Sequence, residues 1–289
     1  MIKIGITGAT GFIGSRVVAQ CRSHGHEITG FSRRPQPGAR PFRPDAPPDL
    51  AGLDAIVNLA GEPILGLWTA EKKRRIRDSR IAGTRRIVEA IQAMPERPRV
   101  LVNASAIGIY GDTGETLVDE SSPAGDGFLA DVCREWEGEA SRAECAGVRV
   151  VFVRIGFVLG QGGALKLIRP VFKLGLGGKL GSGRQWMSGV HVNDVAGMIS
   201  WALENETVNG PVNAVMPAPF RNSEFTAEMA RSVRRPAILP APAFALRLAL
   251  GELSHAMLDS ARVAPGIARK HGYAYQFPTL PLALGDAAR

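Results

Sequence analysis

Short apolar runs alternate with amphipathic stretches along the first 155 residues of the chain. Residues 2–7 form a short β-branched run bounded by a glycine, which predicts a buried strand. In residues 12–23, Ile13, Val17 and Cys21 recur at helical spacing, which predicts a helix. By the same criteria we expect strands at 27–32, 54–60, 99–104 and 148–155, and helices at 69–94 and 128–145. This order predicts an α/β fold with a doubly wound parallel sheet and right-handed crossovers.

Two parts of the chain depart from this alternation. Residues 33–50 are rich in proline and arginine, which predicts a loop with at most a poor strand near 40–43. After Gly156 the chain is rich in glycine and proline, and we expect strands at 190–192 and 212–215 and helices at 193–204, 223–231 and 243–258. We therefore expect a Rossmann domain of residues 1–160, to which 188–207 return, and a smaller C-terminal α/β domain on the substrate side, formed by 161–187 and 208–289.

The first predicted strand leads into a glycine turn, Gly8-Ala9-Thr10-Gly11-Phe12-Ile13-Gly14. In such a turn the first glycine allows the tight bend, the second lets the backbone approach a pyrophosphate, and the third lets helix and strand pack closely. The helix N-terminus favours an anion because its N–H groups are free and its dipole is positive there. Glycine spacing alone is weak evidence, but here it follows a strand and opens an amphipathic helix. The turn therefore predicts dinucleotide binding; the alternative is a purely structural bend.

The end of the second predicted strand indicates which dinucleotide is bound. Domains specific for NAD place an Asp or Glu there, about 20 residues beyond the glycines, to hold the ribose 2′-hydroxyl. This chain has Ser32-Arg33-Arg34 and no carboxylate. Two guanidinium groups suit a 2′-phosphate, which arginine can bind in a bidentate manner. We therefore expect NADP(H), with exposed solubilising arginines as the alternative interpretation.

The 289-residue chain carries a formal net charge of +8, which favours an anionic partner. The densest basic stretch, residues 72–86, lies in a predicted helix without interleaved aromatic residues. We interpret it as a solvated helix face and expect no nucleic-acid partner, since an RNA-binding signature is also absent.

The cysteines and histidines suggest neither disulfides nor metal. Cys21, Cys133 and Cys145 form no CxxC pair, so we expect reduced thiols and a cytoplasmic location. The five histidines show no metal-ligand spacing with these cysteines, so no metal site is expected. No apolar run approaches the roughly 18 residues of a membrane span, so a soluble protein without a membrane partner is expected.

Further motifs resemble one protein family. The glycine turn and Asp54-Ala55-Ile56-Val57-Asn58-Leu59-Ala60-Gly61 are similar to the extended short-chain dehydrogenases/reductases, the relatives of the nucleotide-sugar epimerases. Within this group the chain resembles an atypical, NAD-dependent epimerase/dehydratase-like branch, the "epimerase family proteins" with a C-terminal domain of unknown function. The segments that carry this likeness are 58–63, 79–84, 104–112, 154–160 and 175–183, and residues 246–251 and 272–284 resemble the terminal domain.

The resemblance implies a set of NADP(H) contacts. The glycine turn holds the pyrophosphate, Ser32 and Arg33 hold the adenosine phosphate, Arg80 reaches toward the cofactor, and Val158 lies near the nicotinamide. The residues assigned to the cofactor are Gly8, Thr10, Gly11, Phe12, Ile13, Gly14, Ser32, Arg33, Arg34, Asn58, Leu59, Ala60, Gly61, Arg80, Ser105 and Val158.

The family's ordinary catalytic pair is missing. Short-chain dehydrogenases use a serine, a tyrosine and a lysine four residues after the tyrosine, and Ser105 stands at the position of the serine. No Tyr-xxx-Lys occurs in the chain, and the helix that should carry it reads Phe128-Leu129-Ala130-Asp131-Val132-Cys133-Arg134-Glu135-Trp136-Glu137. In one interpretation Tyr110 supplies the acid–base group beside Ser105. In the other, Tyr110 is a packed tyrosine and the protein is a non-catalytic NADP(H)-binding sensor or regulator.

The expected function is that of an NADP(H)-dependent oxidoreductase or nucleotide-sugar epimerase-like enzyme. Its substrate would be a small molecule of the sugar or carbonyl class, and the chain would be a monomer or a homodimer. We interpret Cys133 as a buried helix cysteine and not as a reactive thiol. We interpret Asp194 as a helix cap and His191 as a packing residue.

Overall fold

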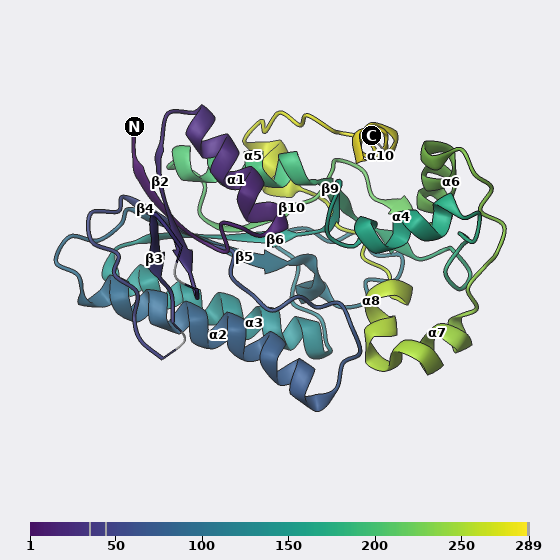
Figure 1. Ribbon diagram of the computed structural model, residues 1–289, viewed down its shortest axis with the longest axis horizontal. Coiled ribbons are helices and arrows are strands. Elements are labelled where there is room, and N and C mark those ends of the chain that lie inside the picture. Colours follow the sequence, from purple (N-terminus) through teal and green to yellow (C-terminus); the bar gives the residue numbers. More distant parts are fainter. Residues whose placement is uncertain (35, 44, 288–289) are drawn as a thin grey trace.

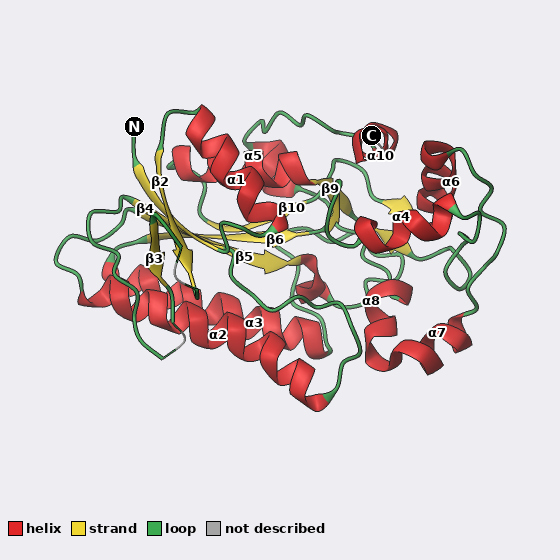
Figure 2. Ribbon diagram, viewed as in Figure 1, coloured by secondary structure: helices red, strands yellow, loops and turns green. Residues whose placement is uncertain are grey.

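The fold is built around one parallel sheet with helices on both faces (Figures 1 and 2). The structure is a computed structural model that describes residues 1–34, 36–43 and 45–287. Its large sheet has seven strands in the order β10-β6-β5-β4-β1-β2-β3, all paired in parallel. These strands are β1 (Lys3–Thr7), β2 (Glu27–Ser32), β3 (Ala39–Pro41), β4 (Ala55–Asn58), β5 (Val100–Ala106), β6 (Arg149–Ile155) and β10 (Gly210–Ala214). The predicted doubly wound α/β fold is confirmed.

Two pairs of helices enclose this sheet. Helices α1 (Phe12–Ser23) and α5 (Val192–Glu204) cover one face, and α2 (Ala70–Ala93) and α3 (Phe128–Ser141) cover the other (Figure 1). Alternate residues of the central strands β4, β5 and β6 enter two separate cores: Val57 packs with α1 and α5, whereas its neighbour Ile56 packs with α2 and α3. The strands are therefore apolar on both faces, which explains why they are continuous apolar runs in the sequence.

A smaller group of elements lies beyond one end of the sheet (Figure 1). Its core joins the buried faces of α4 (Leu165–Lys173), α6 (Asn222–Val233) and α10 (Leu280–Ala287). Two short sheets accompany it, one of β7 (Phe157–Leu159) with β9 (Gly189–His191) and one of β8 (Trp186–Met187) with β11 (Phe220–Arg221). The remaining short helices are α7 (Ala243–Leu250), α8 (His255–Leu258) and α9 (Gly266–Lys270).

The structure corrects three details of the predicted organisation. Residues 208–289 were assigned to the smaller domain, but β10 pairs with β6 and forms an edge of the large sheet. The helix predicted at 243–258 is broken at Gly251, whose φ of +55° is unfavourable for other residues. The helix predicted at 128–145 ends at Ser141 and continues as a 3₁₀ turn. Among the described residues, no helix combines the length and the apolar character needed to cross a membrane.

Buried polar side chains connect the ends of the three central strands. Thr7, Asn58 and Asn103 occupy paired positions on β1, β4 and β5. Thr7 Oγ1 donates to Asn58 Oδ1 at 2.7 Å, and Asn58 Nδ2 donates to Asn103 Oδ1 at 2.7 Å. Thr84 Oγ1 of α2 accepts hydrogen bonds from Asn58 Nδ2 and from Trp136 Nε1 of α3, each at 2.8 Å. This network connects the ends of β1, β4 and β5 to α2 and α3.

We expect Asn58→Ala to lower the free energy of unfolding by about 2 kcal/mol or more, because it leaves buried polar groups without partners. Urea unfolding followed by circular dichroism measures this loss. Asn209→Ala is the matched control: Asn209 is exposed, and its replacement should change stability by no more than about 0.5 kcal/mol. Equal unfolding midpoints for the two variants would contradict the role given to Asn58.

Candidate functional site

The glycine turn lies where β1 meets α1, at the point where the strand order reverses. Gly8 has a φ of +69°, and its carbonyl accepts a hydrogen bond from the Gly11 N–H at 2.9 Å. A Cβ at Gly14 would lie 2.1 Å from the same carbonyl oxygen, so only glycine fits there without a shift of the backbone. Helix α1 begins at Phe12, and the N–H groups of its first turn have no partners within the helix. The turn therefore presents a compact donor surface that suits a pyrophosphate.

The end of β2 forms a basic margin of this surface. The side chains of Arg33 and Arg34 are exposed, and the Arg34 N–H donates to Ser32 Oγ at 3.2 Å. Glu62 lies near this margin. A hydrogen bond from Lys72 lowers the pKa of the Glu62 carboxyl, and the charge of Arg33 contributes in the same direction. A carboxylate stands close to Arg33, but it comes from the segment after β4 and not from β2.

The segment after β4 passes beneath the turn. The backbone N–H groups of Leu59 and Ala60 donate to Thr7 Oγ1 at 3.1 and 3.2 Å, and a Cβ at Gly8 would lie 3.0 Å from the Leu59 carbonyl. The close packing of these two segments again requires a small residue at Gly8. Asn58 differs from the prediction, because its side chain is 2% exposed and its amide is engaged within the polar network. Asn58 positions the strand ends, and its side chain is not available to a cofactor.

Arg80 supports this segment from α2. Its Nη1 donates to the carbonyls of Glu62 and Ile76 at 3.0 Å each, and its guanidinium lies 5.2 Å from the Trp136 ring centroid. A Cβ at Gly61 would lie 3.2 Å from Arg80 Cζ. Burial lowers the pKa of Arg80. Arg80 thus lies directly under the segment assigned to the dinucleotide.

The glycine-rich segment after β7 covers the ring of Phe12. A Cβ at Gly162 would lie 2.4 Å from the Phe12 ring, and Gly160 and Gly163 also approach it. Val158, on β7, is half-buried against the core shared by α1 and α5. This contact joins the glycine turn to the start of the smaller group of elements.

A second polar row lies at the ends of the next strands. Ser105 of β5 pairs with Arg154 of β6, which in turn pairs with Asn213 of β10. Arg154 binds Glu137 of α3 in a bidentate manner, with Nε to Oε1 at 2.9 Å and Nη2 to Oε2 at 2.8 Å. Ser105 Oγ donates to the same Glu137 Oε1 at 2.6 Å. Burial alone would lower the pKa of Arg154, but the hydrogen bonds and charge of Glu137 outweigh it and raise that pKa.

The hydroxyl of Tyr110 completes this row. It donates to Asn213 Oδ1 at 2.8 Å and accepts from Arg154 Nη1 at 2.8 Å. Burial raises the pKa of Tyr110, although Arg154 acts in the opposite direction. Tyr110 is 5% exposed, so the geometry favours the interpretation of Tyr110 as a packed tyrosine with a satisfied hydroxyl.

Two residues of α3 face Ser105 at the spacing of the missing Tyr-xxx-Lys pair. Cys133 and Glu137 are four residues apart, so they lie on one face of the helix, and both contact Ser105. Burial raises the pKa of the Cys133 thiol to about 11, and the charge of Glu137 adds to this effect. Cys133 is 4% exposed, which agrees with the prediction of a buried cysteine that is not activated.

Sequence reasoning did not identify Glu137, Arg154 or Asn213 as parts of this site. The available signal was the four-residue spacing of Cys133 and Glu137 in the helix that should carry Tyr-xxx-Lys. Arg154 and Asn213 gave no local signal, because each is a single polar residue in an apolar strand. A charged residue in such a strand needs a buried partner, and that requirement was the general indication available.

His191 is the packing residue that was predicted and also caps α5, whereas the role of Asp194 differs from the prediction. His191 Nδ1 accepts from the Asn193 N–H at 3.3 Å, so His191 caps α5, while its ring also packs 3.8 Å from the Phe277 ring centroid. The Asp194 carboxylate instead accepts the backbone N–H groups of Gln276 and Phe277 at 2.8 and 2.9 Å. Asp194 was wrongly predicted as the cap; it fixes a C-terminal segment against α5.

Comparisons with known proteins identify the family of this chain. The profile of the NAD dependent epimerase/dehydratase family matches residues 4–214, and that of a domain of unknown function, DUF1731, matches residues 241–287. The Arabidopsis thaliana "epimerase family protein SDR39U1 homolog, chloroplastic" is 40% identical over 98% of this chain and 86% of its own length. Epimerase family protein YfhF of Bacillus subtilis is 36% identical over 99% of this chain and 97% of its own.

A solved structure shares almost the whole fold. The crystal structure of human epimerase family protein SDR39U1, isoform 2, with NADPH has a TM-score of 0.93 and 33% sequence identity, and the match covers 99% of both chains. The resemblance to an atypical epimerase branch with its own C-terminal domain is thereby confirmed. From its glycine turn to its terminal helix, the chain belongs to the NAD-dependent epimerase/dehydratase family.

Proposed function

We propose that this protein binds NADP(H) across the carboxyl ends of β1, β4 and β5 and acts as an oxidoreductase or epimerase-like enzyme on a small sugar or carbonyl compound. One observation carries the proposal: the Ser105 hydroxyl, which is hydrogen-bonded to Glu137, lies at the carboxyl ends of the strands, as the glycine turn does. A dinucleotide along these strand ends would place its pyrophosphate on α1 and its nicotinamide toward Ser105.

The preference for NADP(H) over NAD(H) rests on charge. Arg33 and Arg34 are exposed at the end of β2, and Lys72 and Arg75 lie beside Glu62. Three cations, Arg33, Lys72 and Arg75, act on the single Glu62 carboxylate and leave an excess of positive charge for a 2′-phosphate. The NADPH in the structure of human SDR39U1 supports the same choice.

The acid–base step is assigned to Ser105 with Glu137 behind it. In the oxidising direction, a substrate hydroxyl would pass its proton to Ser105 Oγ while Ser105 passes its own proton to Glu137 Oε1, 2.6 Å away. A bound nicotinamide would supply the hydride acceptor for the carbon that bears this hydroxyl. Arg154 keeps Glu137 in place through its bidentate contact, and Tyr110 positions Arg154.

A non-catalytic sensor or regulator is the second candidate function. It is favoured by the burial of the polar row, since Ser105 is 3% and Glu137 9% exposed. In this case Cys133 and Glu137, which contact Ser105, would stabilise the protein around a bound NADP(H).

The cofactor preference predicts a difference between two titrations. We expect NADPH to bind about 10-fold or more tightly than NADH, because hydrogen bonds to a charged phosphate contribute about 1.5–3 kcal/mol. Arg33→Ala should remove most of this difference by weakening NADPH alone, as measured by nucleotide fluorescence. Arg235→Ala, an exposed arginine of the smaller group of elements, is the control and should change neither affinity. Equal affinities in the unaltered protein would refute the 2′-phosphate assignment.

The acid–base assignment predicts different effects at two hydroxyls. Ser105→Ala should reduce turnover by about 10²–10⁴-fold, because it removes the proton-transferring group. Tyr110→Phe should reduce turnover by less than about 10-fold, because it removes a positioning contact only. NADPH absorbance across a panel of aldehydes, ketones and nucleotide sugars gives the readout.

The outcomes of this assay separate the interpretations. A loss in Tyr110→Phe as large as that in Ser105→Ala would return the acid–base role to Tyr110. Tight NADPH binding with no turnover across the panel would contradict the enzyme interpretation and favour the non-catalytic sensor.

A further inference from the structure

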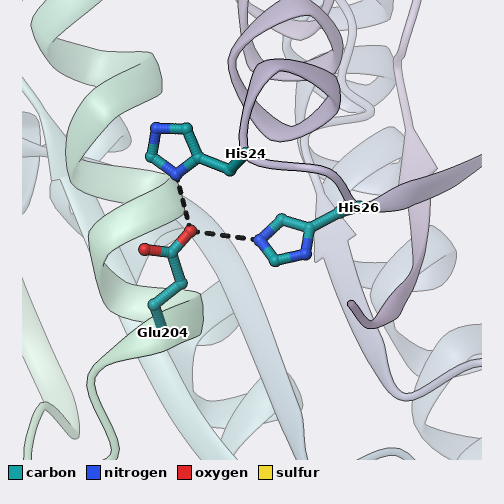
Figure 3. A group of neighbouring side chains, drawn as sticks. All are labelled: His24, His26 and Glu204. Atoms are coloured by element: carbon teal, nitrogen blue, oxygen red, sulfur yellow. Dashed lines mark hydrogen bonds and ion pairs between the residues drawn. The ribbon is translucent and has the colours of Figure 1, made fainter.

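Two histidines and a glutamate converge at the other end of α1 (Figure 3). His24 is the C-cap residue that follows α1, Gly25 turns the chain with a φ of +77°, and His26 precedes β2. Both imidazoles point at the same oxygen, Oε1 of Glu204 at the end of α5: His24 Nδ1 lies 2.8 Å from it and His26 Nε2 3.1 Å. Glu204 is 178 residues from His26 in the sequence, so spacing among histidines and cysteines did not reveal this group.

The three side chains form a donor set with one open side. Their ligand atoms all lie within 4.8 Å of one another. The His26 side chain is 10% exposed, whereas those of His24 and Glu204 are 40% and 41% exposed, so an ion and its water ligands can enter. Burial opposes the charge of Glu204, but hydrogen bonds from His24 and His26 outweigh it and lower the pKa of the carboxyl. Two imidazole nitrogens are thus directed at one anionic oxygen, and the three potential ligand atoms are close together.

We propose that His24, His26 and Glu204 bind one divalent transition-metal ion of the Zn²⁺ type. Zinc takes imidazole nitrogen and carboxylate oxygen at about 2.0–2.2 Å in a tetrahedron, which separates ligand atoms by roughly 3.3–3.6 Å. The present separations of 2.8 and 3.1 Å from Glu204 Oε1 are close to that spacing, so small side-chain rotations suffice. Water completes the coordination on the exposed side.

Neighbouring side chains support these ligands. Gln20 Nε2 lies 3.0 Å from His24 Nε2, and rotation of this amide would let its oxygen accept the Nε2–H of a metal-bound His24. Ser200 Oγ donates to Glu204 Oε1 at 3.2 Å and orients the carboxylate. Such outer partners hold metal ligands in position.

The position of the trio indicates a structural role. The glycine turn lies at the N-terminus of α1, and the trio lies at its C-terminus, about 18 Å away along a helix of 12 residues. An ion there would not touch a cofactor on the glycine turn. It would instead join the end of α1 to the end of α5, the two helices that cover one face of the sheet.

The test uses untagged full-length protein treated with a chelator, so that no added histidines bind metal. Calorimetric titration should show one Zn²⁺ per chain, and Co²⁺ should give the visible absorption of a bound, low-symmetry ion. Zn²⁺ should also raise the thermal unfolding midpoint, since a ligand that binds only the folded state stabilises it.

Variants identify the ligands. His24→Gln, His26→Gln and Glu204→Gln should each weaken Zn²⁺ binding by about 10-fold or more and abolish its effect on the unfolding midpoint. His255→Gln is the matched control, because His255 also pairs with a carboxylate, Asp259, at 3.1 Å but has no second histidine beside it. Circular dichroism without metal confirms that each variant is folded, and Co²⁺ absorption reports on the site independently of stability.

The opposite results would overturn the proposal. If the unaltered protein binds no Zn²⁺ at millimolar concentration, the trio is an ion pair only. If Zn²⁺ binds with equal affinity to folded His26→Gln and Glu204→Gln variants, its site lies elsewhere.

Discussion

The buried ion pair between Arg154 and Glu137 is the interaction on which the arrangement of the site depends. A charged residue inside a parallel sheet is costly unless a partner and further hydrogen bonds satisfy it. Glu137 supplies the negative charge that pairs with Arg154. Ser105 donates a further hydrogen bond to Glu137, and Tyr110 accepts one from Arg154. These contacts connect β5, β6 and β10 to α3, so the ion pair sets both the packing of the helix and the direction of the Ser105 hydroxyl.

The chain has no Tyr-xxx-Lys pair, but Ser105 is still surrounded by polar and charged side chains. Cys133 and Glu137 lie one turn apart on α3 and face Ser105, and the cation beside them is Arg154 of β6. The charged side chain that α3 brings to Ser105 is thus a carboxylate, and its partner cation comes from a strand of the sheet. A hydroxyl held by an ion pair remains at the site, but its partners are different in kind.

Local sequence patterns predicted the strands, the helices over them and the glycine turn, because each depends on neighbours in the chain. Where they failed, the deciding contact was distant. Asp194 stands at the start of a helix and resembles a cap, yet its carboxylate binds the backbone of Gln276 and Phe277. Asn58 belongs to the segment assigned to the cofactor, yet its amide donates hydrogen bonds to Thr84 and Asn103. The strand at 210–214 was predicted to belong to the smaller domain, because nothing in its residue pattern indicates that it pairs with β6 of the large sheet.

The sequence by itself determined the α/β order, the place of the glycine turn and the lack of a Tyr-xxx-Lys pair, since these are properties of residue type and spacing. Only the tertiary structure decided which polar residues meet. Two groups of side chains come from separate elements. One is Ser105, Glu137 and Arg154, and the other is His24, His26 and Glu204. The physical reason is that all strands of a parallel sheet run in the same direction. Their carboxyl ends therefore lie together, as do their amino ends, and side chains from distant parts of the chain can interact there.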